Sequence, residues 1–321
     1  MFARQRVWKP YIKGQTTGAG HLGRQVARDI SYSHSAETRG GRALIRTLEN
    51  ATGRLKLIRR AAGYEAEVAQ GADFWQVMVE RYGLSLNVVG GSIANLPATG
   101  PLVVVSNHPY GILDGLVMGH ILSALRCGDF RILANSVFKK AEELNRVLLP
   151  ISFDTSREAV AGNLQTRKDA LAYLSQGGAI GVFPGGTVST SVKPFSSRPM
   201  DPAWRSFTAK MISKSGATVV PMFFEGSNSR LFQVASHLHQ TLRLALLIKE
   251  FKRRTDEPVN LVIGDPIPAV ELDAYRTDQK AMMDFLRART YALSPKQLDP
   301  AYGFEFEEMH KRAQTDGGRN I

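Results

Sequence analysis

Cysteine is almost absent from this sequence, with Cys127 the single example among 321 residues. One cysteine excludes an internal disulfide framework and any cysteine-rich zinc or iron–sulfur site, and it suits a reducing compartment. An uncharged apolar run of about 20 residues is also missing, so we expect no membrane-spanning helix. The basic N-terminal stretch lacks the apolar core of a secretory signal, so we expect a cytoplasmic protein.

Acidic residues are scarce relative to basic ones, at 29 Asp and Glu against 41 Lys and Arg, which gives a net charge of +12. Such a charge attracts polyanions, and both nucleic acid and an anionic membrane surface qualify. Apolar residues make up 43% of the chain and charged residues 22%, which is typical of a folded globular protein and excludes a disordered or coiled-coil chain. Because no spanning helix is expected, any membrane contact should be peripheral, at the inner face of the membrane.

The chain divides into regions that differ in composition and hydrophobic pattern. We expect a poorly ordered basic arm at 1–40, a basic amphipathic helical region at 41–84, one main domain at 85–294 and a C-terminal tail at 295–321. The helical region has two interpretations, because its apolar faces can pack on the main domain or lie against a membrane.

Short apolar runs alternate with helical patterns throughout the main domain. Strands are expected at 102–105, 131–134, 148–153, 179–183, 218–224 and 260–263, and helices at 113–125, 137–147, 157–174, 204–213 and 238–253. This alternation predicts an α/β fold with a mixed, largely parallel sheet that is flanked by helices on both faces.

The most unusual segment is Ser-Asn-His-Pro-Tyr-Gly-Ile-Leu-Asp, in which an apolar strand runs into a polar loop at His108. Loops at the carboxyl ends of strands are where open α/β sheets place ligands. Asp114 falls in the first turn of the following helix and can point back to the imidazole, which would make His108 a competent base. The alternative is a core histidine beside an Asp that merely favours the helix dipole.

Two further strands also end in polar loops. Phe183-Pro-Gly-Gly-Thr187 is a glycine-rich turn whose N–H groups could face an anion, or could simply end a strand. The segment from Glu225 to Arg230, which contains Asn228, could line a site or close its loop by local hydrogen bonds.

In this order, the segments together resemble the glycerolipid acyltransferases of the lysophosphatidate type. The resemblance runs from residue 89 to 268 and rests on Asn107-His108 with Asp114, on the run 149–153 with Arg157, on Phe183-Pro184-Gly185-Gly186-Thr187, and on Val220-Pro221. The residues of the first and last loops are similar to those of a bacterial branch named hemolysin-like, which is related to the acyltransferases of ornithine-lipid synthesis.

The resemblance implies that His108 takes a proton from the hydroxyl of a lysolipid, which then attacks an acyl thioester, and that Asp114 supports the imidazole. The donor would be acyl-CoA or acyl carrier protein, and no cofactor or metal is expected. By the same resemblance, the residues expected to bind substrate are Asn107, Arg157, Phe183, Pro184, Gly185, Gly186, Thr187 and Asn228. Cys127 lies outside these segments and is not expected to be a nucleophile.

The sequence departs from the family pattern at the third block. Gly185 and Val188 stand where the family has the Glu and Arg that are associated with a phosphorylated acceptor, and five residues rather than four separate His108 from Asp114. We therefore expect an acceptor other than plain lysophosphatidate, or a phosphate held by a cation elsewhere. The cations considered for that role are Arg157 first, then Lys139, Lys140, Lys193 and Arg230.

Two other classes of protein remain as alternatives. A nucleic-acid-binding protein is favoured by the net charge of +12 but by no zinc-finger, RNP or Gly-x-x-Gly signature. A cytolytic protein of the hemolysin type is suggested by the branch name, but the long amphipathic strands of a pore are missing.

Overall fold

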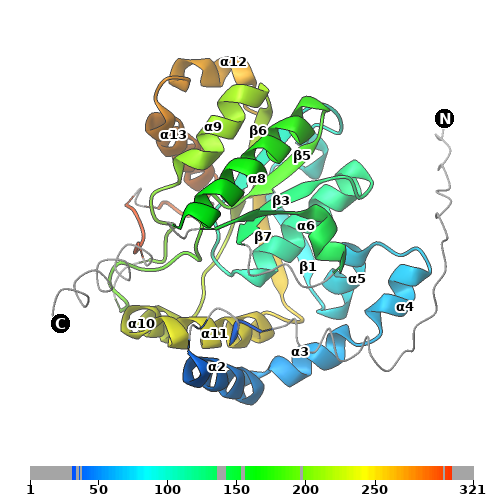
Figure 1. The fold of residues 1–321 in the computed structure, drawn as a ribbon, viewed down its shortest axis with the longest axis vertical. Coiled ribbons are helices and arrows are strands. Elements are labelled where there is room, and N and C mark those ends of the chain that lie inside the picture. Colours follow the sequence, from blue (N-terminus) through cyan, green and yellow to red (C-terminus); the bar gives the residue numbers. More distant parts are fainter. Residues whose placement is uncertain are drawn as a thin grey trace.

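A mixed β-sheet forms the centre of the molecule (Figure 1). The computed structural model describes residues 31–33, 36, 38–135, 142–152, 156–195, 198–298 and 301–305. In this part of the chain the sheet has seven strands in the order β1-β7-β6-β2-β5-β3-β4. The strands are β1 Ser85–Gly90, β2 Leu102–Ser106, β3 Arg131–Asn135, β4 Leu148–Ile151, β5 Ala179–Val182, β6 Thr218–Phe224 and β7 Pro258–Ile263. All neighbouring pairs are parallel except β6 and β7.

Helices cover both faces of this sheet (Figure 1). They are α2 Arg39–Thr52, α3 Arg54–Ala61, α4 Tyr64–Ala69, α5 Phe74–Arg81, α6 Ile112–Arg126, α7 Glu142–Val147, α8 Arg157–Ser175, α9 Ser206–Ser215, α10 Arg230–Leu238, α11 Gln240–Arg253, α12 Ala269–Leu272 and α13 Gln279–Ala292. None of the helices within the described residues combines the length and apolar character that crossing a membrane requires.

Two separate cores follow from the alternation of side chains along the central strand β2. Leu102 and Val104 pack into the core that contains α5, α6 and α11, whereas Val103 and Val105 pack into the core that contains α8, α9 and α13. Successive side chains of a strand point to opposite faces, and every residue of β2 is buried because helices cover both faces. The predicted α/β class with a largely parallel, doubly covered sheet is confirmed.

Most predicted elements of the main domain are present, with shifts of a few residues at their ends. The sequence patterns missed β1, an edge strand whose side chains alternate between exposed and half-buried. They also missed α13, as well as α10, which is separated from α11 by His239 alone. For the helix predicted at 137–147, the structure has α7 at Glu142–Val147, and residues 136–141 lie outside the described residues.

The N-terminal helical region packs on the main domain. Helix α2 begins after Thr38, whose hydroxyl accepts a hydrogen bond from Gly41 N at 3.0 Å, and it runs beside α11 at the lower edge of Figure 1. Ahead of it, Tyr32 N donates to the buried carboxylate of Glu49 at 2.7 Å. The rest of the predicted arm, residues 1–30, lies outside the described residues.

Part of the predicted tail also lies on the domain. Gly303 N donates to Asp201 O at 2.8 Å, and Phe304 N donates to Thr190 O at 3.0 Å. These contacts bring the C-terminal segment to the same edge of the sheet as the loops singled out from the sequence.

Candidate active site

The three loops singled out from the sequence meet at one edge of the sheet. They follow β2, β5 and β6, and β2 pairs in parallel with both of the other strands. Because the carboxyl ends of parallel strands point the same way, all three loops emerge side by side. The local patterns found the loops, and the strand order β6-β2-β5 brings them together.

His108 and Asp114 face each other at the start of α6. The imidazole Nδ1 lies 3.0 Å from Asp114 Oδ2, with the His108 side chain 18% exposed and the Asp114 side chain fully buried. The two side chains are thus in direct contact through Nδ1 and Oδ2. The pairing that the sequence predicted is therefore present in the structure.

The extra residue between His108 and Asp114 is accommodated by Gly111. This residue has a φ of +90°, a left-handed value that favours glycine, and it immediately precedes the first residue of α6. Asp114 Oδ2 accepts hydrogen bonds from Tyr110 N at 2.8 Å and from Gly111 N at 3.0 Å. Asp114 thus caps the helix and faces the histidine with the same carboxylate oxygen.

The environment of Asp114 acts on its ionisation in two opposing ways. Burial raises the pKa of this carboxyl above its ordinary value, and the contacts with His108 and with the two backbone N–H groups lower it. A positive charge on the neighbouring imidazole is therefore the natural partner for the carboxylate.

Asp201 holds the backbone of the His108 loop, and the sequence analysis missed it. Its Oδ1 accepts from His108 N at 3.2 Å and from the Ser189 hydroxyl, and its Oδ2 accepts from Trp204 Nε1 at 2.9 Å. Ser189 N in turn donates to His108 O at 2.8 Å. Asp201 is fully buried and 93 residues from His108 in the chain, so no local motif could have found it.

Asp201 also explains the glycine in the third block. A side chain built at Gly185 would meet the carboxyl of Asp201 at 3.3 Å. This contact is tighter than an ordinary van der Waals distance, so the close approach of Asp201 favours glycine at this position.

Arg243, from α11, supports the other side of the same turn. It is 3% exposed, and it donates to the Thr187 hydroxyl at 3.0 Å, to Val188 O at 2.8 Å, and to the hydroxyls of Thr190 and Ser236 at 2.7 Å each. The sequence analysis missed this residue too, because its partners lie up to 56 residues away.

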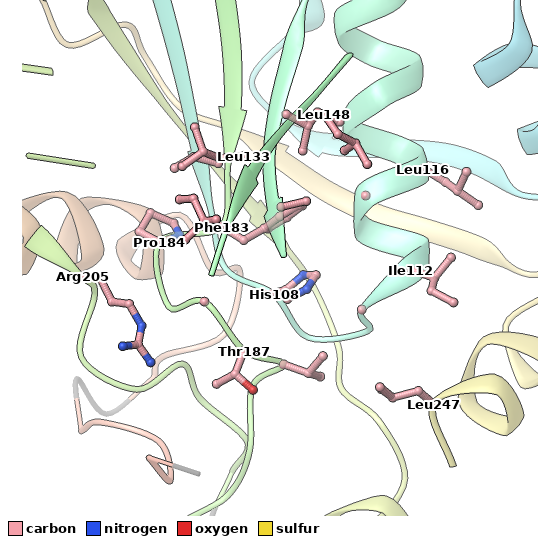
Figure 2. Close-up of a pocket in the computed structure, with 18 of the residues that line it drawn as sticks. His108, Ile112, Leu116, Leu133, Leu148, Phe183, Pro184, Thr187, Arg205 and Leu247 are labelled. Atoms are coloured by element: carbon pink, nitrogen blue, oxygen red, sulfur yellow. The ribbon is translucent and has the colours of Figure 1, made fainter. Parts of the chain in front are cut away.

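His108 lies in the wall of a largely apolar cavity of about 490 Å³ (Figure 2). Its ring stacks on Phe183 with 4.2 Å between the centroids. The apolar lining includes Ile112, Leu116, Leu133, Leu148, Phe183, Leu244 and Leu247. A cavity of this size and lining suits an apolar chain of a ligand.

The predicted substrate-binding residues fall into two groups. Phe183, Pro184, Gly186 and Thr187 line the cavity with His108, whereas Gly185 is not part of the lining. Asn107 is not part of it either, because its buried amide donates to Phe224 O at 2.9 Å and accepts from Phe224 N at 2.7 Å. These contacts tie the end of β2 to the end of β6, and the substrate-binding role of Asn107 stays a prediction.

Asn228 and Arg157 also lie away from this cavity. Asn228 is 3% exposed and lines a second, more polar cavity of about 500 Å³ on the other side of the Asn107–Pro109 loop. Arg157 is exposed at the first position of α8 and is not among the residues that line the cavity of His108, so its role as the anion-binding cation stays a prediction.

The cations that do line the cavity, among the described residues, are Arg205 and Arg243. Arg205 lies just before α9, and its side chain faces the same space as His108 and Thr187 (Figure 2). Its guanidinium lies 3.4 Å from the carboxylate of Glu305. Of the other cations considered, Lys193 and Arg230 are exposed outside this lining, and Lys139 and Lys140 lie outside the described residues.

Within the described residues, no cluster of three or more His, Cys, Asp or Glu side chains could hold a metal ion. Cys127 is exposed at the end of α6 and does not line the cavity. The chemistry that this site offers is that of a histidine–carboxylate pair at an apolar cavity.

Comparison with known proteins shows the family of the chain. The model of a family described as acyltransferase matches residues 69–300, which include the whole site. The chain belongs to the acyltransferase family. This acyltransferase is 28% identical over 214 residues to a lyso-glycine lipid O-acyltransferase of Phocaeicola vulgatus, a match that covers 64% of this chain and 73% of the relative.

A second protein of the same name, from Bacteroides thetaiotaomicron, is 26% identical over 220 residues, which cover 66% of this chain and 77% of the relative. Among solved structures, the 1-acyl-sn-glycerophosphate acyltransferase PlsC of Thermotoga maritima matches with a TM-score of 0.43 and 15% identity, over 87% of this chain and 90% of the other. The family match and the named relatives confirm the predicted glycerolipid acyltransferase family and the prediction of an O-acyltransferase.

Proposed function

We propose that this acyltransferase moves a fatty acyl group from acyl-CoA or acyl carrier protein to the hydroxyl of a lysolipid. The observation that carries the proposal is the His108–Asp114 pair in the wall of an apolar cavity. Because Nδ1 faces Asp114, Nε2 is the nitrogen that takes the proton of the acceptor hydroxyl. The hydroxyl oxygen attacks the thioester carbonyl, the C–S bond breaks, and the leaving thiolate recovers the proton from His108.

We propose that the hydroxyl of Thr187 stabilises the negative charge that develops on the thioester oxygen. Thr187 lines the cavity and accepts a hydrogen bond from Arg243 at 3.0 Å, so its own proton is available to donate. Gly186 N is engaged within the turn, where it donates to Phe183 O at 3.0 Å. The positive charge of Arg243 behind the hydroxyl strengthens such a donor.

The acceptor in this proposal carries an anionic headgroup other than a simple phosphate. Two relatives are named for a lyso-glycine lipid, and a glycine headgroup with a free carboxylate would be anionic. The third block lacks the Glu and Arg of the phosphate-binding pattern. Arg205 is the cation proposed to hold the headgroup, because it lines the cavity with His108 and its contact with Glu305, at 3.4 Å, can exchange for a headgroup carboxylate.

We further place the reaction at the cytoplasmic face of a membrane, where the acceptor resides. The net charge of +12 supports attraction to anionic lipid and to the phosphates of coenzyme A or the acidic surface of acyl carrier protein.

The experiment is a thiol-release assay with acyl-CoA and, separately, acyl carrier protein, against a panel of lyso-glycine lipid, lyso-ornithine lipid and lysophosphatidate. The proposal expects transfer to an amino-acid lysolipid and a KM for it that rises about tenfold in Arg205→Ala, with Arg157→Ala as the matched control. Preference for lysophosphatidate together with an inert Arg205→Ala change would refute the acceptor assignment. Absence of acyl transfer to every acceptor would refute the function.

A further inference from the structure

Helix α10 has a buried apolar face and, beside it, an exposed apolar stripe. One face packs into the domain through Phe232 and Ala235, which are 0% and 5% exposed. Leu231 and Leu238 are 51% and 69% exposed. They are seven positions apart, which is about two helical turns, so they lie on the same side of the helix. A surface helix ordinarily presents polar side chains to water, so this exposed apolar stripe calls for a partner.

A neighbouring loop extends the exposed apolar surface. His237 Nε2 lies 2.7 Å from Ser191 O, and Arg230 Nη1 donates to Pro194 O at 3.2 Å, so the segment 191–194 runs along α10. Beside these contacts, Val192 is 51% exposed and Phe195 is 78% exposed. We call the side chains of Val192, Phe195, Leu231 and Leu238 the α10 patch.

Basic side chains are exposed on the segments that carry the α10 patch: Lys193 and Arg198 in the loop, and Arg230 at the start of α10. Residues 185–200 contain Lys193 and Arg198 without any Asp or Glu. Arg243 is buried in the site and adds no surface charge, and the acidic Glu305 follows Phe304, whose ring lies 4.1 Å from that of His237 in α10. Exposed apolar side chains in a basic surrounding complement a surface that is apolar beneath a layer of anionic groups.

The α10 patch also adjoins the opening of the substrate cavity. Thr187 and Val188 line the cavity a few residues before Val192. On the other side, Gln240 follows Leu238 by two residues, and it is both exposed and part of the lining. The cavity therefore reaches the surface next to the patch.

We propose that the α10 patch is the surface by which this acyltransferase docks on an anionic lipid bilayer, so that a lipid acceptor passes directly between the membrane and the cavity. This inference rests on the proposed function for the identity of the acceptor. It assigns the membrane contact to α10 rather than to α2 and α3, which belong to the basic helical region for which the sequence left a membrane contact open. There Leu44 and Leu55 are each 47% exposed, but Arg54 is buried and Arg60 pairs with Asp256.

The test compares three pairs of Leu or Val to Glu changes in sedimentation with vesicles of phosphatidylglycerol and phosphatidylcholine. Leu231→Glu with Leu238→Glu is expected to weaken binding by about tenfold or more, because two apolar contacts are replaced by negative charges at an anionic surface. The matched control is Val160→Glu with Leu164→Glu, which alters exposed side chains of α8, at 58% and 45% exposure, elsewhere on the fold (Figure 1). The third pair is Leu44→Glu with Leu55→Glu.

Loss of binding in the α10 pair alone supports the proposal. Loss in the N-terminal pair alone, or equal loss in all three, overturns it. If the α10 pair folds poorly, Phe195→Glu is a second variant, because this loop side chain is 78% exposed. The proposal is also overturned if the α10 pair folds and binds vesicles normally and the Phe195→Glu variant binds them normally too.

Transfer to a detergent-dispersed acceptor separates docking from chemistry. The α10 pair is expected to keep near-normal rates in detergent and to lose rate only on vesicles, and equal losses in both would contradict the docking role. If wild-type protein shows no transfer at all but its vesicle binding depends on the α10 pair, the proposed function fails and the docking surface stands.

Discussion

The loop that carries His108 and the turn that carries Thr187 follow adjacent parallel strands, yet different kinds of contact hold them in place. The His108 loop is fixed largely by carboxylates, with Asp114 facing the ring and Asp201 receiving the backbone N–H. The Thr187 turn is fixed by a cation, Arg243, which donates to the hydroxyl and to the carbonyl after it.

In the mechanism proposed above, this difference suits the charges that acyl transfer creates. The imidazole becomes positive when it takes the proton, so carboxylates near it stabilise that state. The thioester oxygen becomes negative, so a buried guanidinium behind its hydroxyl donor stabilises the opposite charge. The two neighbouring loops are thus prepared for charges of opposite sign, and each prediction below tests one side of that comparison.

The largest effect is expected from His108→Ala. Removal of the general base should lower turnover by about 10²–10⁴-fold, because no other described histidine lines the cavity. Thiol release with the best acceptor measures it, and thermal unfolding checks the fold. The matched control is His120→Ala, a half-buried histidine of α6 outside the lining, which should keep near-normal turnover.

Asp114→Asn should be nearly as damaging, although it keeps the shape of the side chain. The amide oxygen can still accept from Tyr110 N and Gly111 N, but the negative charge beside the imidazole is lost, with an expected fall in turnover of about 10²-fold or more. Steady-state kinetics against Asp129→Asn, a change at a carboxylate outside the cavity, provides the comparison. Unaltered turnover would reduce Asp114 to a helix cap.

On the opposite side, Thr187→Val removes the hydroxyl and nearly conserves the volume. Turnover should fall by about 10²-fold, in kcat more than in KM, because the contact is made to a charge that exists only in the transition state. Thr187→Ser restores the donor and should recover most of the rate. If the valine and serine variants behave alike, the hydroxyl has no part in the chemistry.

Asp201→Asn should have the smallest effect on turnover and a clear effect on stability. The new amide group would face either Trp204 Nε1 or His108 N, both of which are donors, so one buried N–H loses its acceptor. Such a loss costs about 1–3 kcal/mol in the free energy of unfolding, which denaturant titration can measure. Wild-type stability in this variant would show that Asp201 does not hold the loop.

The sequence could predict the parts of this site that are close together in the chain. His108 and Asp114 share one loop and one helical turn, and Phe183 to Thr187 form a single turn, so their patterns are local. Asp201, Arg205 and Arg243 reach the site only through the packing of α9, α11 and the segment before α9, and no local spacing encodes those contacts.

The same limit applies to the fold. Central strands such as β2 were predicted because burial on both faces gives an unbroken apolar run. The edge strand β1 lacks such a run, since only alternate residues are half-buried, and α10 merges in sequence with α11.

The most direct test of the account is a double-mutant cycle on His108 and Asp114, with turnover measured for wild type, His108→Ala, Asp114→Asn and the double variant. If Asp114 acts through the imidazole, the double variant should be no slower than His108→Ala alone, because the carboxylate has nothing left to support. Losses that multiply in the double variant, or near-normal turnover in His108→Ala, would contradict the proposed pair.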